Sequence, residues 1–226
     1  MKTAESRRVR DLVYETLAQE GRAPSVAELA RRTDSAAADV GRILHELADD
    51  HALVLTPDGD AIRMAHPFTS APMAFVLTPL DGHDDRRWWG GCAWDSFGIS
   101  AALGIDVRID SACPHCGAQL SIDAGPEMPP PDGPVVRFPR PARDWWNDVV
   151  GTCTMIRMFC DRGHAKRWTD ENAPGHGCIA DALAVWRLAQ PWYGDRLAPD
   201  FQPHGREHNQ KLLDDCGLTG DFWRLP

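Results

Sequence analysis

Apolar residues recur every three or four positions in the first fifty residues of the chain, a spacing typical of amphipathic helices. A first helix is expected over residues 5–20. Its buried face would comprise Val9, Leu12, Val13 and Leu17. Ser25 is followed three residues later by Glu28, a pair that forms a capping box where a second helix begins. A third helix after Ser35 would bury Val40, Ile43, Leu44 and Leu47.

The segment HALVLTPDGDAIRM, residues 51–64, contains two short apolar runs around the turn Pro57-Asp58-Gly59, which predicts a β-hairpin. Three helices followed by a hairpin predict a winged-helix-like unit over residues 1–66. Winged helices often bind DNA through the third helix. Residues 35–50 contain one arginine and four acidic residues, and phosphates would repel such a helix. We therefore favour a structural module and expect no nucleic-acid partner.

The chain changes character after His66-Pro67-Phe68 and becomes rich in Trp, Gly, Pro and Cys. Strands are expected at residues 74–78, 105–109, 119–122 and 153–159. Helices are expected at residues 92–103, from 164 to 168 onward, 177–190 and 207–216. The proline-rich segment 125–144 is expected to be a loop or extended arm rather than a central strand. The predicted fold class is α+β: a winged-helix-like three-helix unit, then a mixed β-sheet domain with flanking helices over residues 67–226.

Composition and charge narrow the function classes. The 226 residues are 43% hydrophobic, as in a folded protein with a core, and the net charge of −9 disfavours general binding to nucleic acid. The longest apolar runs are far shorter than the ~20 residues of a membrane-spanning helix. The first residues lack the apolar core of a signal peptide. We therefore expect a cytoplasmic protein without a membrane partner, in which the seven cysteines bind metal, act in catalysis or are buried.

Two groups of cysteines have spacings that suit chemistry. Cys92-Ala-Trp-Asp95 places a thiol and a carboxylate on one face at a helix start, where the helix N-terminus is expected to lower the thiol pKa. The alternative is a buried cysteine beside an aspartate that caps the helix. The second group combines Cys113-Pro-His-Cys116, like one knuckle of a zinc ribbon, with a Cys-x3-His pair. The resulting candidate structural zinc ligands are Cys113, Cys116, Cys160 and His164.

Several segments occur in the order and at the spacing seen in organomercurial (alkylmercury) lyases. They are His66-Pro67-Phe68, Cys92-Ala-Trp-Asp95 with a helix ending at Leu103-Gly104, Cys113 followed by Gly117, and CTMIRMF over residues 153–159. The chain resembles this family from its N-terminal unit to about residue 190. Two cysteines, Cys116 and Cys160, and the extended tail beyond residue 191 depart from the family pattern.

The resemblance implies that residues 67–226 are an alkylmercury-lyase-like catalytic domain with Cys92, Asp95 and Cys153 as the catalytic residues. Cys113 corresponds to a structural cysteine of the family. Thiolates are the soft ligands that mercury prefers, so the product Hg(II) would be held by Cys92 and Cys153. Asp95 would accept a thiol proton and return it to the leaving carbon. No bound cofactor is required, and cellular thiols or a mercuric reductase would collect the metal.

Other functions remain open at this point. One is a related protein that binds a soft metal, zinc or mercury, without turnover. Another is a winged-helix regulator that senses metal through its cysteines, which the acidic third helix disfavours. A third is a relative that uses the same thiols on a non-mercury substrate. An alternative to zinc for the group around Cys113 and Cys160 is a relay that passes mercury out of the pocket by thiol exchange.

Overall fold

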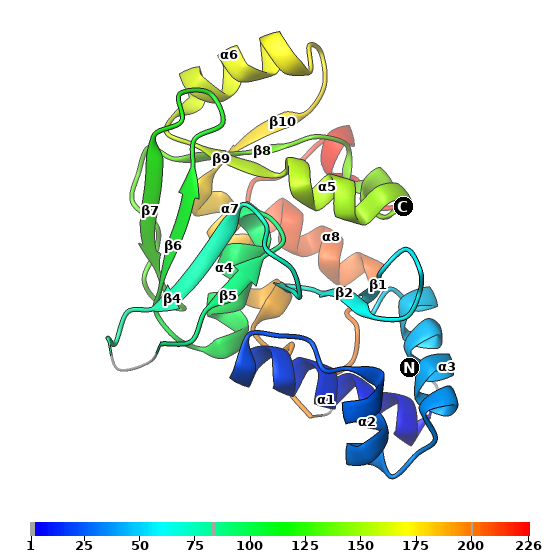
Figure 1. Cartoon of the computed structure of the whole chain (residues 1–226). Helices are drawn as coiled ribbons and strands as arrows, with labels where there is room; N and C mark the ends of the chain where they lie inside the picture. Colours follow the sequence, from blue (N-terminus) through cyan, green and yellow to red (C-terminus); the bar gives the residue numbers. More distant parts are fainter. Residues whose placement is uncertain (1–2, 83–84, 200) are drawn as a thin grey trace.

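Three helices form the N-terminal part of the chain: α1 (Ala4–Glu20), α2 (Val26–Thr33) and α3 (Ala37–Asp49). The computed structural model describes residues 3–82, 85–199 and 201–226. The predicted capping box is present, because Ser25 and Glu28 exchange side-chain-to-backbone hydrogen bonds at the start of α2. The three helices pack together at one end of the molecule (Figure 1). This helical unit is confirmed, while its assignment as a winged helix remains a prediction.

A seven-stranded sheet follows, with the strand order β1-β2-β3-β5-β4-β6-β7. Its strands are β1 (Val54–Leu55), β2 (Ile62–Ala65), β3 (Phe68–Thr69), β4 (Phe75–Pro79), β5 (Trp88–Gly90), β6 (Val107–Ala112) and β7 (Gln119–Ala124). The predicted hairpin is β1–β2, and β2 pairs with β3 across the cis peptide bond His66–Pro67. The sheet thus continues through the domain boundary predicted at residues 66–67, and the division into two domains remains a prediction.

A second sheet has three strands in the order β10-β8-β9. Its strands are β8 (Val135–Phe138), β9 (Arg157–Phe159) and β10 (Cys178–Asp181). The prediction that residues 125–144 contain no central strand was therefore wrong. The prolines of this segment lie on both sides of β8 rather than within it, so every ladder position keeps its N–H group. The α+β class is confirmed, but every strand pair among the described residues is antiparallel rather than mixed in direction.

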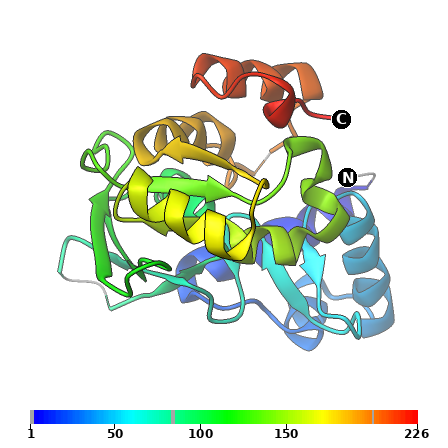
Figure 2. The same ribbon diagram turned by 90° about the horizontal axis from the view of Figure 1, so that it is seen from above.

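The remaining helices are α4 (Ala93–Leu103), α5 (Val149–Met155), α6 (Arg162–Asn172), α7 (Ala182–Tyr193) and α8 (Arg206–Asp215), with 3-10 turns η1 (Ala142–Asp148) and η2 (Asp221–Trp223). Two predictions need correction. The run 153–159 is a strand only from Arg157, because Cys153 lies in α5. The helix predicted over 177–190 begins only at Ala182, because residues 178–181 pair with β8 as a strand. The short helix predicted in the tail is confirmed as α8, which lies on an outer edge of the molecule (Figure 2).

Helix α4 is the centre of the structure. All residues from Ala93 to Ala102 are buried, including the polar residues Asp95, Ser96 and Ser100. One side of α4 contacts β4 and β5 of the large sheet, and another contacts α7. The start of α4 is therefore fixed deep inside the molecule. In the part of the chain that the structure describes, no helix has the length and apolar character needed to cross a membrane.

Candidate active site

Cys92 is the N-cap residue of α4, and Asp95 lies in the first turn of the same helix. The N–H of Asp95 donates a hydrogen bond to the Cys92 sulfur at 3.3 Å. The N–H of Ala93 donates to the carbonyl of Ile156 at 3.1 Å, which ties the start of α4 to the end of α5. This backbone contact brings Cys153, on α5, to the thiol–carboxylate pair despite a separation of 58 residues from Asp95.

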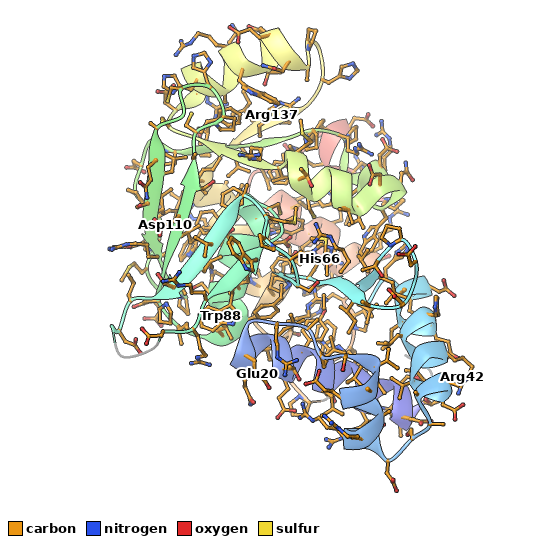
Figure 3. The ribbon with its side chains drawn as sticks, viewed as in Figure 1. Glu20, Arg42, His66, Trp88, Asp110 and Arg137 are labelled. Carbon is orange, nitrogen blue, oxygen red and sulfur yellow. The ribbon has the colours of Figure 1, made fainter. Side chains whose placement is uncertain are left out.

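The Asp95 carboxylate is the centre of the site and is 1% exposed. The Cys153 sulfur lies 3.8 Å from Oδ2 of Asp95, and Nδ1 of His66 lies 3.3 Å from the same oxygen. The hydroxyl of Tyr193, on α7, donates a hydrogen bond of 2.8 Å to the other oxygen, Oδ1. Figure 3 labels His66 in the middle of the molecule, near the junction of the N-terminal unit and the large sheet. Three other segments of the chain thus converge on the Asp95 carboxylate.

A cavity of about 100 Å³ opens onto these groups. Besides Cys92, Asp95 and Cys153, its lining is mainly aromatic: His51, His66, Trp94, Trp145, Trp146, Trp192 and Tyr193. Trp146 is 41% exposed and its ring stacks on His51, so it forms part of the rim. Trp94 and Trp145 are buried and pack against each other. A small apolar pocket ending at two thiols and a carboxylate suits a compact hydrophobic molecule that carries a thiol-seeking atom.

Two glycines provide the space that this arrangement needs. A Cβ on Gly91 would lie 2.7 Å from Oδ2 of Asp95, so glycine lets the carboxylate sit against the backbone. A Cβ on Gly98 would lie 2.3 Å from the ring of Tyr193. Because Gly98 lacks that atom, α7 approaches α4 closely enough for the Tyr193 hydroxyl to reach Asp95.

Burial dominates the ionisation of the two thiols. Burial raises the pKa of Cys92 well above its usual value, and the neighbouring Cys153 and Asp95 raise it further. The N–H of Asp95 at the helix start acts in the opposite direction but is outweighed, so the expected lowering of the Cys92 pKa was wrong. For Cys153, the hydrogen bond from Cys92 lowers the pKa. Burial and the Asp95 carboxylate together have the larger, opposite effect, so the Cys153 pKa is raised. Both residues are therefore thiols at neutral pH.

The structure brings together the three residues predicted to be catalytic and adds two that the sequence did not single out. His66 belongs to the His-Pro-Phe segment but had no predicted role, and Tyr193 carried no sequence signal at all. The predicted zinc ligands form a separate group: one ligand atom each from Cys113, Cys116, Cys160 and His164, all within 4.8 Å of one another. This group lies where the β6–β7 turn meets the start of α6.

The chain has an α+β fold with a buried dithiol–carboxylate centre, and thiolates are the ligands that soft metals prefer. The chain belongs to the alkylmercury lyase family, whose profile matches residues 68–194, more than half of its length. Family membership makes it a carbon–mercury lyase, as the resemblance in the sequence predicted. It is also similar to a solved structure, the crystal structure of the mercury-bound form of MerB2. The TM-score is 0.66 at 21% identity, over 87% of this chain and 93% of that chain, which shows a common fold. No curated protein sequence matches the chain.

Proposed function

We propose that Cys92, Cys153 and Asp95 cleave the carbon–mercury bond of an organomercurial by protonolysis. The observation that carries this proposal is the position of the Asp95 carboxylate, 3.8 Å from the Cys153 sulfur. Among the described residues, no Lys or Arg forms an ion pair with Asp95, whose charged-group contact is with His66. A carboxylate so placed can take a proton from a thiol and pass it to an adjacent carbon. The aromatic lining of the cavity would hold the organic group.

The reaction begins with thiol exchange. An incoming R–Hg–thiolate transfers its R–Hg group to one cysteine sulfur, and the displaced thiol leaves with that cysteine's proton. The other cysteine then gives its proton to Asp95 as its sulfur binds mercury. Two thiolates increase the electron density on mercury and weaken its bond to carbon. Because both thiols are buried and protonated, a nearby base is needed at this step.

Bond cleavage follows when protonated Asp95 returns the proton to carbon. The electron pair of the carbon–mercury bond forms the new C–H bond, R–H leaves, and Hg(II) remains on Cys92 and Cys153. Tyr193 and His66 hold the carboxylate in position through their contacts with its two oxygens. Two external thiols then exchange for the cysteines and release mercury. The chemistry requires no bound cofactor, and cellular thiols or a mercuric reductase in the cytoplasm would receive the metal.

The direct test is to incubate the protein with phenylmercury and excess thiol and to measure benzene by gas chromatography. Cys92→Ser and Cys153→Ser should each abolish turnover, because a hydroxyl is a poor mercury ligand. Asp95→Ala should retain mercury binding while benzene release slows by about 10²–10⁴-fold, the usual contribution of a positioned acid–base group. Cys216→Ser, which changes a cysteine at the end of α8, is the control that should release benzene normally. Native turnover in Asp95→Ala would refute the proton-transfer role.

A further inference from the structure

Three cysteines and one histidine meet at a corner of the molecule away from the cavity. Cys113 and Cys116 lie in the turn between β6 and β7, in the large sheet. Cys160 follows β9 of the small sheet, and His164 lies in the first turn of α6. The group therefore joins segments of two different sheets, and no role in carbon–mercury cleavage falls to it.

Two distances within the group match the edges of a tetrahedral zinc site, and all four ligand atoms lie within 4.8 Å of one another. Zinc–sulfur bonds of about 2.3 Å and zinc–nitrogen bonds of about 2.0 Å place two sulfurs about 3.8 Å apart, and a sulfur and a nitrogen about 3.5 Å apart. The sulfurs of Cys116 and Cys160 are 3.8 Å apart. The Cys113 sulfur is 3.7 Å from Nδ1 of His164. A disulfide between Cys116 and Cys160 would require about 2.05 Å.

Asp161 contacts both the backbone and the ring of His164. Nδ1 of His164 lies 3.7 Å from the Cys113 sulfur, while its Nε2, on the other side of the ring, lies 4.0 Å from the Asp161 carboxylate. Asp161 is itself fixed as the N-cap of α6, where it accepts a hydrogen bond from the His164 N–H at 2.8 Å.

This corner has little core of its own. Its separate apolar cluster contains four fully buried residues: Cys113, Val135, Phe159 and Ala165. So small a cluster offers limited hydrophobic stabilisation, and small units of this kind are commonly held by a metal.

We propose that Cys113, Cys116, Cys160 and His164 bind one structural zinc ion that fastens the β6–β7 turn to the start of α6. Three thiolates and one imidazole in a closed tetrahedral set leave no open position for substrate, so this zinc stabilises the fold without taking part in turnover.

The test uses the full chain purified in reductant, without chelator and without added metal, followed by elemental analysis. About one zinc per chain is expected. Cys116→Ser and His164→Ala should reduce zinc to background, whereas Cys153→Ser and Cys216→Ser should keep it. Chelator should lower the Tm of the unaltered protein but not that of Cys116→Ser. Because a ligand variant can fail to fold, chelator-treated unaltered protein is also titrated with Co(II), which should give the absorption of tetrahedral cobalt–thiolate.

Three results would overturn the proposal. One is folded protein that arrives without metal and acquires neither zinc nor tetrahedral cobalt. Another is zinc that is lost in Cys153→Ser but retained in Cys116→Ser, which would place it in the cavity. The third is a Cys116–Cys160 disulfide, found by mass spectrometry in protein kept in reductant. The first and third results leave the catalytic residues untouched, and benzene release is measured separately in every case, so failure of this proposal can be told apart from failure of the catalytic proposal.

Discussion

At the scale of single residues, the Tyr193 hydroxyl donates a hydrogen bond to the Asp95 carboxylate, and it is the only hydroxyl among the described residues that does so. Tyr193→Phe would leave Oδ1 of a buried carboxylate without this hydrogen bond. The cost of such a loss is about 1–3 kcal/mol of folding free energy. Benzene release should also slow, because the carboxylate is free to turn from the carbon it must protonate. Urea unfolding and single-turnover benzene release measure the two effects, and native values for both would show that Tyr193 does not position Asp95.

The raised pKa values of Cys92 and Cys153 predict a stability change with pH. In the unfolded chain these thiols ionise near pH 8.5, whereas the folded protein keeps them protonated to higher pH. Their contribution to stability is therefore complete below about pH 8.5 and is lost as pH rises toward the folded pKa values. Each thiol lowers the free energy of unfolding by up to about 1.4 kcal/mol per pH unit in that window.

Urea titrations between pH 7.5 and 10 measure this slope. The double variant carrying Cys92→Ala and Cys153→Ala should lose less stability across this range than the unaltered protein. Equal slopes for the two proteins would mean that the thiols are not held protonated by burial.

At this scale, the sequence predicted the site residues that belong to a recognisable motif and did not predict those without a motif around them. Cys92 and Asp95 are linked by one turn of helix, and Cys153 follows from the family resemblance. Tyr193 stands 98 residues from Asp95, and nothing in its neighbours indicates that it faces a carboxylate. The thiol pKa was mispredicted because spacing reveals a helix N-terminus but does not reveal how deeply that terminus is buried.

At the scale of elements, the contact between α4 and α7 sets the geometry of the site. Gly98→Ala would place a Cβ 2.3 Å from the Tyr193 ring and force the two helices apart. Overpacking of this kind costs about 1–3 kcal/mol, and benzene release should fall because Tyr193 moves away from Asp95. Gly41→Ala in α3 is the matched control, since no atom lies within 4 Å of its added Cβ. It should stabilise the protein by up to about 1 kcal/mol.

Thermal unfolding and benzene release of both variants test whether the site requires the close approach of α7 to α4. If Gly98→Ala behaved like Gly41→Ala, close approach of α7 would not be required for the site.

The elements that sequence predicted well are those with a local signal. The Ser25–Glu28 capping box and the apolar stripes of the first helices depend on residues within a turn or two. Strand β8 was missed because its signal is non-local: all four of its residues are buried, so polar and apolar positions do not alternate. Its partners β9 and β10 come later in the chain. Helix α5 resembled a strand in its apolar run, although Asp148, which caps it through the N–H of Gly151, was a readable start signal.

At the scale of the whole molecule, contacts cross from the N-terminal unit to the catalytic region at several points. The indole N–H of Trp88 donates to the carbonyls of Leu17 and Ala18. The Tyr14 hydroxyl donates to the carbonyl of His66, the residue that contacts Asp95. One continuous apolar core also includes buried residues of both parts. The N-terminal unit therefore supports the site rather than lying beside it.

These contacts predict that the chain unfolds in one cooperative step. Heating or urea should give coincident transitions by tryptophan fluorescence, which reports mainly on the catalytic region, and by far-ultraviolet circular dichroism, which reports on all helices. Deleting residues 1–66 should give a protein that neither folds cooperatively nor releases benzene, because the deletion removes β1, β2 and the cavity residues His51 and His66. Two separate transitions, or a folded and active fragment 67–226, would instead show that the boundary at residues 66–67 divides independent domains.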